Sequence, residues 1–252
     1  MARIYAFLQA RSDSSRLPGK VLKKILGREM ILHQLHRLRK SERVDGLILL
    51  TSDEESDDLL ASVVQRAGYS LFRGKKSDVL ARFFDCAGAF GLQSEDIVLR
   101  LTGDCPLHHA SIVDELIDAF LQSGADYMAN CVDPVVYPDG LDAEIFRLRT
   151  LEEAYKGAKR PSEREHVTPY IRDCGSFVCS ALYKEPIHPE WRLTVDEAED
   201  FELVKRVYEH FGHSDFSIGE LFEYLEENPH LTRINSHIGR NEGYLKSLEE
   251  ES

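Results

Sequence analysis

Residues 3–22 read RIYAFLQARSDSSRLPGKVL, an apolar run followed by a loop that is rich in cations and contains Pro-Gly. The run from Ile4 to Leu8 predicts a buried strand, because it is short, apolar and bounded by turn-forming residues. Arg11, Arg16 and Lys20 follow on the loop, where a single acidic residue opposes them. We interpret this segment as the first strand of an α/β sheet and its ligand-binding loop, since open α/β sheets bind ligands at the carboxyl ends of strands.

The loop is a candidate anion site. The chain has 44 acidic and 31 basic residues and a net charge of -13, so this group of cations is a local reversal of sign. With the hydroxyl of Ser14, the cations could hold a triphosphate through charge-assisted hydrogen bonds. The loop is not a Walker A motif, because Ser14 and Val21 stand where that motif needs Gly and Ser or Thr. Taken alone, the cations would equally suit a solvated basic loop.

Several strings, in a fixed order, make the chain resemble a known family. They are QARSDSSRLPGKVL at 9–22, SDVLARF at 77–83, TGDCPL at 102–107, DGLDAE at 139–144, EREHVTPYI at 163–171 and RLTVDEAEDFELV at 192–204. Together they resemble the cytidylyltransferases that activate acidic sugars, and within them the SpsF-like branch of spore coat polysaccharide biosynthesis, related to the CMP-KDO and CMP-sialic acid synthetases. The resemblance covers most of the chain. It implies transfer of CMP from CTP to an acidic sugar or phosphorylated acceptor, with release of pyrophosphate.

The resemblance also assigns site residues. The catalytic cations around the phosphates would be Arg11, Arg16 and Lys20. The nucleotide would be held by Leu8, Ala10, Arg11, Ser14, Arg16, Lys20, Arg82 and Asp104, with backbone groups reading the base. The acceptor would be bound by Asp142, Glu144, Glu165 and His166. Two alternatives stay open: a solvated strand face for Asp142 and Glu144, and an exposed salt-bridged turn for Glu165 and His166.

Asp104 is the first candidate magnesium ligand. It follows an alternating strand in IVLRLTGDCPL at 97–107, between a glycine and a further turn, so its carboxylate is held at the rim of the sheet. Mg²⁺ takes one or two carboxylates and completes its shell with phosphate and water. In the resemblance Asp196 is the second ligand. We expect the two carboxylates to be unpaired and adjacent, a repulsion that Mg²⁺ removes. The alternatives are a turn former at Asp104 and a helix cap at Asp196.

Apolar periodicity alternates between strands and helices along the chain. Further strands are predicted at 47–51, 69–73, 97–102, 125–130, 141–148, 177–183 and 191–196, and helices at 30–41, 56–68, after Ser77, after Ser111, at 151–172 and after Asp196. This rhythm predicts a mostly parallel, Rossmann-like α/β/α sandwich. We expect one nucleotidyltransferase domain over 1–252, with a small mixed lobe at about 131–190 that the resemblance associates with the acceptor and with dimerisation.

Composition narrows the functional classes. Hydrophobic residues make up 42% and charged residues 30%, which is typical of a soluble globular protein. The negative net charge argues against binding to nucleic acid or to an anionic membrane. No apolar run approaches the ~20 residues of a membrane span, and the five scattered cysteines favour a reducing cytoplasm. We therefore expect a cytoplasmic enzyme, and the resemblance adds a homodimer.

Two other functions compete with nucleotidyl transfer. A nucleotide-sugar-dependent glycosyltransferase would use an Asp-x-Asp metal motif, which DGLD at 139–142 does not supply. A non-catalytic nucleotide-binding protein would be expected to lack one of Lys20, Asp104 and Asp196, and the chain has all of them. A CTP-dependent enzyme of surface polysaccharide biosynthesis is the favoured hypothesis.

Overall fold

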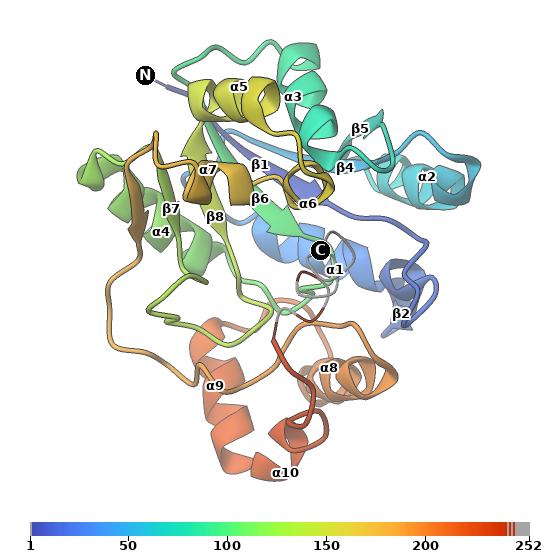
Figure 1. Cartoon of the computed structure of the whole chain (residues 1–252). Coiled ribbons are helices and arrows are strands. Elements are labelled where there is room, and N and C mark those ends of the chain that lie inside the picture. The colour runs from blue at the N-terminus through green and yellow to red at the C-terminus, as the bar shows by residue number, and fades with distance from the viewer. Residues whose placement is uncertain (1, 241, 243, 245–252) are drawn as a thin grey trace.

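The computed structural model describes residues 2–240 together with Glu242 and Tyr244. Seven strands form one sheet in the order β5-β4-β1-β6-β8-β7-β9 (Figure 1). Their bounds are β1 Ile4–Gln9, β4 Gly46–Ser52, β5 Ser70–Gly74, β6 Ile97–Thr102, β7 Tyr127–Ala129, β8 Glu144–Arg147 and β9 Cys179–Ala181. A separate hairpin pairs β2 Lys24–Ile25 with β3 Arg28–Glu29.

Helices cover both faces of the sheet. They are α1 Met30–Leu38, α2 Asp58–Arg66, α3 Val79–Ala89, α4 Ala110–Ser123, α5 Leu148–Gly157, α6 Pro161–His166, α7 Pro169–Asp173, α8 Ala198–Phe211, α9 Ile218–Glu227 and α10 Pro229–Thr232, with short 3₁₀ turns at Lys20–Leu22 and Glu55–Asp57. α3 and α5 lie on one face and α1 and α4 on the other, while α8 to α10 pack beyond α1 (Figure 1). The α/β/α sandwich is confirmed.

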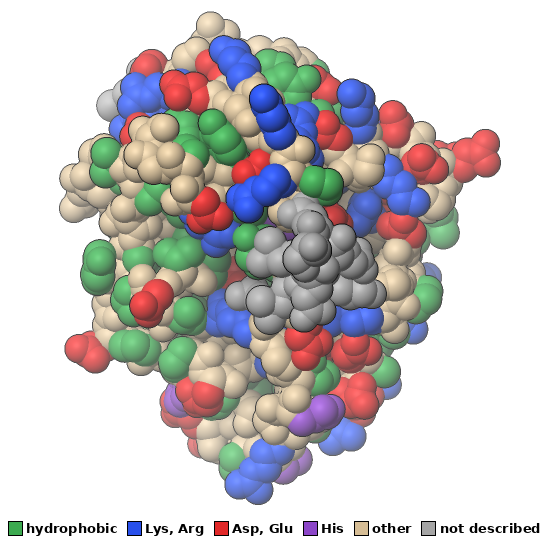
Figure 2. All heavy atoms as spheres, in the orientation of Figure 1, with side chains coloured by type: hydrophobic (Ala, Val, Ile, Leu, Met, Phe, Trp, Pro, Cys, Tyr) green, Lys and Arg blue, Asp and Glu red, His purple; other side chains and the backbone are tan. Residues whose placement is uncertain are grey.

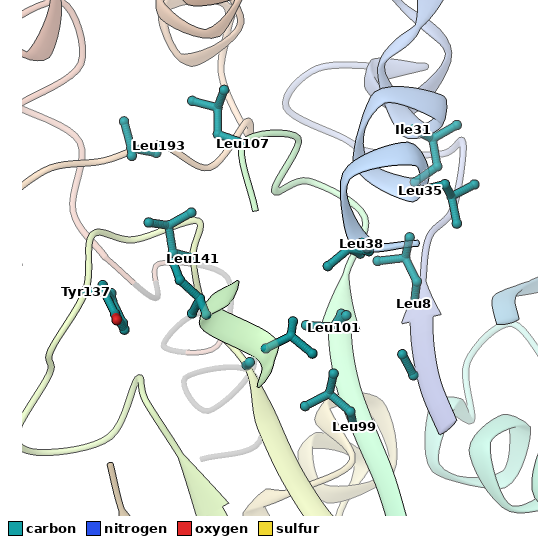
Figure 3. Close-up of a cluster of buried hydrophobic side chains, with 14 of the residues drawn as sticks. Leu8, Ile31, Leu35, Leu38, Leu99, Leu101, Leu107, Tyr137, Leu141 and Leu193 are labelled. Carbon is teal, nitrogen blue, oxygen red and sulfur yellow. The ribbon is translucent and has the colours of Figure 1, made fainter. Parts of the chain in front are cut away.

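The core explains why the central strands are mostly apolar. Side chains alternate along β1: Leu8 belongs to the cluster beneath α1 and α4, and Phe7 to the cluster beneath α3 and α5. Figure 3 shows Leu8 with Leu99 and Leu101 of β6 and with Leu38 of α1. A strand buried on both faces has no polar alternation, and each buried leucine contributes roughly 1.5–3 kcal/mol through removal of apolar surface from water.

The strand directions bring the loops of the first half of the chain to one edge. β1 runs parallel to β4 and β6, with Leu8 opposite Leu49 and Leu101, and β4 runs parallel to β5. β8 is antiparallel to β6 and β7, and β9 is parallel to β7. The carboxyl ends of β5, β4, β1 and β6 therefore meet at the same edge. The cation-rich loop after β1 and Asp104 after β6 both lie there.

The predicted last strand at 191–196 is wrong. This segment forms only an isolated bridge between Asp139 and Arg192. Its backbone pairs with loops instead, since the N–H of Val195 donates to the carbonyl of Asp104 at 2.7 Å and that of Leu193 to the carbonyl of Asp139 at 2.6 Å. The segment thus crosses the ends of the strands, which still brings Asp196 beside Asp104.

Two predicted helix caps are also wrong by one or two residues. α3 is capped by Asp78 rather than Ser77, because Oδ1 of Asp78 accepts the N–H of Ala81 at 2.9 Å. α4 is capped by His109, whose Nδ1 accepts the N–H of Ser111 at 3.1 Å. Each cap is still a polar side chain that satisfies a free N–H of the first turn.

The predicted lobe at 131–190 contributes β8 and β9 to the same sheet and α5 to α7 to one face of it. The acidic tail LEEES, expected to fray, lies outside the described residues. Among the described helices none combines the length and the apolar character that a membrane crossing requires.

Candidate active site

A cavity of about 520 Å³ opens at the carboxyl ends of the central strands. It takes in most of the predicted nucleotide residues: Ala10, Arg11, Ser14, Arg16, Lys20, Arg82 and Asp104 all line it, as do Glu165 and His166. Leu8 does not line it, because its side chain is fully buried and its strand is paired on both sides. On the face shown in Figure 2, Lys and Arg side chains lie among Asp and Glu side chains.

Two glycines shape the walls of the cavity. Gly19 has φ +67°, and its N–H donates to the carbonyl of Ser12 at 3.0 Å, which folds the cation-rich loop back on itself. That left-handed conformation suits glycine. At Gly103 a Cβ atom would lie 2.6 Å from the Cβ of Ala10. The glycine thus lets the loops after β1 and β6 approach, and Lys20 reaches the turn that holds Asp104.

Lys20 joins the two predicted metal ligands. Its Nζ donates to Asp104 Oδ2 at 3.2 Å, to Asp196 Oδ1 at 2.9 Å and to the carbonyl of Val195 at 2.8 Å. These acceptors use all the N–H groups of an ammonium. Lys20 is only 8% exposed. Burial lowers the pKa of its ammonium, but the two carboxylates outweigh burial and raise that pKa above its usual value.

Asp104 remains ionised at this position. Burial alone would raise its pKa, whereas the Lys20 ammonium and hydrogen bonds from Thr102 and Cys105 lower the pKa to about 2. A carboxylate with this pKa carries its charge throughout the physiological range. Asp104 is thus available as an oxygen ligand or as a partner for a cation.

The expectation that the two carboxylates are unpaired is wrong. Besides Lys20, Asp196 pairs with Arg16, whose Nη2 lies 3.0 Å from Oδ1, and with Arg192, whose Nη2 lies 2.9 Å from Oδ2. Each of the two carboxylates therefore has at least one cationic partner. Repulsion between the carboxylates cannot be the reason for a metal here.

Arg192 is a central residue that sequence reasoning missed. It is 5% exposed, and its guanidinium contacts Asp196, Asp200 at 3.0 Å and Asp139 at 2.8 Å. Asp200 in turn accepts the N–H groups of Asp196 and Glu197 at 2.8 and 2.9 Å, so it steadies the turn. The sequence offered one signal for this role: Arg192 stands four residues before Asp196, the predicted metal ligand.

Arg192→Met is expected to lower the free energy of unfolding by about 3–5 kcal/mol, because it leaves the fully buried carboxylate of Asp200 without its main cation. Chemical denaturation measures this change. Arg206→Met on α8 is the matched control, since Arg206 pairs with Glu202 on an exposed surface; a change within about 0.5 kcal/mol is expected there. Equal effects of the two substitutions would contradict the role given to Arg192.

The acceptor candidates fall into two groups. Glu165 and His166 are half-buried and line the cavity. The His166 ring lies 5.1 Å from that of Tyr244, and burial lowers the pKa of His166 although the nearby charge of Glu165 raises it. Asp142 and Glu144 do not line the cavity.

Glu144 is not on a solvated strand face. It is 5% exposed, pairs with Arg100 and accepts hydrogen bonds of 2.6 Å from Tyr127 and Thr168. Its carboxylate is held in the interior by Arg100 of β6 and Tyr127 of β7, the two strands that flank β8. Burial raises the pKa of Glu144, but Arg100 and the hydrogen bonds lower it below the usual range.

Asp142 has the opposite electrostatic environment. It pairs with Arg240, yet burial and the nearby carboxylates of Asp139 and Glu144 outweigh that pair and raise the pKa of Asp142 to about 7. A carboxyl group with this pKa exchanges a proton near neutral pH.

The donor set near Lys20 fits a hard divalent cation. Across the described residues, no cluster of three or more His, Cys, Asp and Glu side chains is arranged to hold a metal. Asp104 and Asp196 do, however, converge on one cationic group, Lys20. Mg²⁺ commonly uses one or two carboxylates and takes its other ligands from phosphate and water. The two carboxylates meet this requirement.

Comparisons of the chain with known proteins agree with the geometry. A family model described as cytidylyltransferase matches residues 5–227. Spore coat polysaccharide biosynthesis protein SpsF of Bacillus subtilis is 34% identical over 91% of this chain and 96% of its own length. An uncharacterized protein of Methanocaldococcus jannaschii is 34% identical over 94% of this chain and 96% of its own length.

Solved structures give the same picture. A cytidylyltransferase from Leptospira borgpetersenii superposes with a TM-score of 0.86 at 33% identity, covering 92% of this chain and 97% of that chain. A CMP:2-keto-3-deoxy-manno-octonic acid synthetase complexed with CTP has a TM-score of 0.63 at 17% identity, covering 83% and 99%. The second likeness establishes the shared fold alone.

Proposed function

Because this chain belongs to the cytidylyltransferase family, we propose that it transfers CMP from CTP to an acidic sugar, with release of pyrophosphate, in the biosynthesis of a surface polysaccharide. The observation that carries the proposal is the cavity that Arg11, Arg16 and Lys20 line together with Asp104. The relatives named for spore coat polysaccharide and for 3-deoxy-manno-octulosonate cytidylyl transfer support the acceptor class.

The chain's own residues would bind and orient the triphosphate. An oxygen of the acceptor attacks the α-phosphorus in line, and negative charge grows on the phosphoryl and bridging oxygens as pyrophosphate leaves. Arg11, Arg16 and Lys20 are the donors placed to stabilise that charge, and no protein nucleophile is required. Among the described residues, the contacts of Arg11 are long, 3.7 Å to Asp13 and 3.4 Å to the carbonyl of Lys76. It is thus the cation most readily turned toward a phosphate.

We propose Mg²⁺ as the cofactor, held by Asp104 and Asp196, where it would neutralise phosphate charge and polarise the α-phosphoryl group. Lys20 then exchanges at least one of its carboxylate partners for a phosphate oxygen. Arg192 and the turn at Asp200 keep the Asp196 carboxylate in place during that exchange.

Glu165 and His166 are the residues we propose for contacts with acceptor hydroxyls, since both line the cavity. Asp142 and Glu144 lie outside the cavity lining, so they would position the acceptor-binding residues rather than contact the acceptor. We also propose a cytoplasmic homodimer formed through the lobe at 131–190. Its edge strand β9 is flanked by the exposed side chains of Val178 and Tyr183, and exposed apolar groups at an open edge favour pairing.

CTP is expected to stabilise the protein more than UTP, GTP or ATP in the presence of Mg²⁺. A ligand at ~100 times its dissociation constant adds ~2.7 kcal/mol to the free energy of unfolding, which a thermal melt detects. A clear preference for GTP or ATP would overturn the cytidylyl assignment. Stabilisation by a nucleotide sugar but by no nucleoside triphosphate would instead favour a glycosyltransferase.

A further inference from the structure

A short segment late in the chain reaches into the cavity. The described residues of this segment, which we call the strap, are Gly239, Arg240, Glu242 and Tyr244. Glu242 lines the cavity, and its Oε2 lies 3.4 Å from Nη1 of Arg16. Its other oxygen, Oε1, accepts the N–H of Gly239 at 3.0 Å, so the backbone of the strap itself holds the carboxylate in place. The family model matches the chain only as far as residue 227, and the strap lies beyond that match.

Arginine contacts attach the strap to the rest of the fold. Arg240 pairs with Asp142, and its Nη1 donates to the carbonyl of Tyr137 at 3.3 Å. The carbonyl of Gly239 accepts Nη1 of Arg192 at 3.1 Å. The buried Nε of Arg240 has no hydrogen-bond partner among the described residues, so this attachment leaves one donor unsatisfied. The strap residues belong to neither apolar cluster of the core. The strap can therefore shift without disrupting either cluster.

The contact between Glu242 and Arg16 conflicts with the proposed role of Arg16. Arg16 is one of the cations placed to bind the triphosphate, and its acidic partners are Asp196 at 3.0 Å, Glu197 at 3.6 Å and Glu242. Asp196 is a proposed magnesium ligand that also pairs with Arg192, and Glu197 stands at the N-terminal end of α8. Glu242 is the partner that belongs to the strap. Because like charges repel at close range, the Glu242 carboxylate and a triphosphate would compete for Arg16.

The strap also lies against an acceptor candidate. The Tyr244 ring packs edge-on against His166, with 5.1 Å between the ring centroids. The Arg172 guanidinium lies 5.9 Å from the centre of the Tyr244 ring. His166 lines the cavity. One short segment thus contacts both a cation proposed for the phosphates and a residue proposed for the acceptor.

We propose that the strap is an autoinhibitory element: Glu242 occupies Arg16 in the ligand-free protein, and the triphosphate displaces it on binding. The inference rests on the proposed function, which makes Arg16 a phosphate-binding cation. The exchange replaces one anion on Arg16 with another. The apparent affinity for nucleotide is then reduced by the fraction of molecules in which Glu242 occupies Arg16.

The test compares the dissociation constants of inorganic triphosphate and of CTP, each with Mg²⁺, for the wild type and Glu242→Gln by isothermal titration calorimetry. The amide cannot form the ion pair, and a partly exposed ion pair corresponds to a factor of about 2 to 5 in an equilibrium constant. Both ligands should therefore bind about 2- to 5-fold more tightly. Arg240→Met, which detaches the strap from Asp142, should tighten binding to a similar degree. In the Arg16→Met background, Glu242→Gln should lose its effect, because the effect depends on the pair.

Glu227→Gln is the matched control, since it makes the same change of net charge at an exposed position on α9 that does not line the cavity; both affinities should be those of the wild type. Thermal melts without ligand report the folding of each variant. Weaker binding by Glu242→Gln would make Glu242 a contact of the bound ligand and overturn the proposal. An unchanged affinity, or an equal gain in Glu227→Gln, would also overturn it, while the proposed function would stand. A wild type that binds neither ligand would contradict the proposed function, and the inference with it.

Discussion

Lys20→Met is expected to lower the turnover of cytidylyl transfer by about 10²- to 10³-fold, the loss typical of removing one donor that stabilises developing negative charge. The structure adds a second reason, because Lys20 is the cation shared by Asp104 and Asp196. Without the Lys20 ammonium, no cation would lie between the two carboxylates. Because that ammonium lowers the pKa of Asp104, this pKa should rise from about 2. Steady-state kinetics of pyrophosphate release measure the effect.

Lys24→Met is the matched control for Lys20→Met. Lys24 is exposed and lies outside the cavity, and its contact with Glu29 is long, at 3.8 Å. Turnover of this variant should therefore stay within a few-fold of the wild type. If Lys20→Met weakened CTP binding while turnover was unchanged, Lys20 would bind the ground state and the transition state equally. That result would remove it from the catalytic cations.

Asp104→Asn and Asp196→Asn are each expected to reduce pyrophosphate release to near the background rate. Both replace a charged carboxylate of the proposed magnesium site with a neutral amide, and the double variant should be little worse than either single one, since residues that act as a unit are not additive. Glu197→Gln is the matched control, because Glu197 also pairs with Arg16, at 3.6 Å, but is not seen to contact Lys20. Activity within a few-fold of the wild type in either Asn variant would exclude that residue from the site.

The stability of these Asn variants should fall rather than rise. If the two carboxylates were unpaired, an amide substitution would remove the repulsion between them and stabilise the fold. Asp104 and Asp196 instead each pair with the buried Lys20, and Asp196 also pairs with Arg192. Removing one member of such a network leaves a buried cation poorly compensated. Stabilised Asn variants, measured without metal, would show that the ion pairs are weaker than the distances suggest.

Local sequence patterns sufficed for most of the fold. The apolar run from Ile4 to Leu8 lies in a strand that packs on both faces, a condition that an unbroken apolar run signals, and the alternating pattern at 97–102 also predicted a strand. The cation-rich loop was placed correctly because Pro-Gly and its position after a strand both point to a turn at the sheet edge. The prediction of a strand at 191–196 was wrong, because an apolar segment that crosses the ends of the strands has the same composition as a strand.

The electrostatics of the site could not be read from the sequence. Lys20 lies 84 positions from Asp104 and 176 from Asp196 in the chain, and nothing in local periodicity specifies that the three meet. The alternating strand left a solvated face open as one of two predictions for Glu144, while its environment depends on Arg100 and Tyr127 of neighbouring strands. Such pairings are properties of register, which one sequence does not reveal.

Acceptor-dependent pyrophosphate release from CTP tests the central claim most directly. The wild type would be incubated with Mg²⁺, each of CTP, UTP, GTP and ATP in turn, and a panel of keto-sugar acids, with the nucleotide labelled at the α-phosphate. The account predicts that CTP with an acidic sugar gives one labelled CMP-sugar for each pyrophosphate released, and that Asp104→Asn abolishes both. Transfer from another nucleotide in preference to CTP, or equal product with Asp104→Asn, would contradict it.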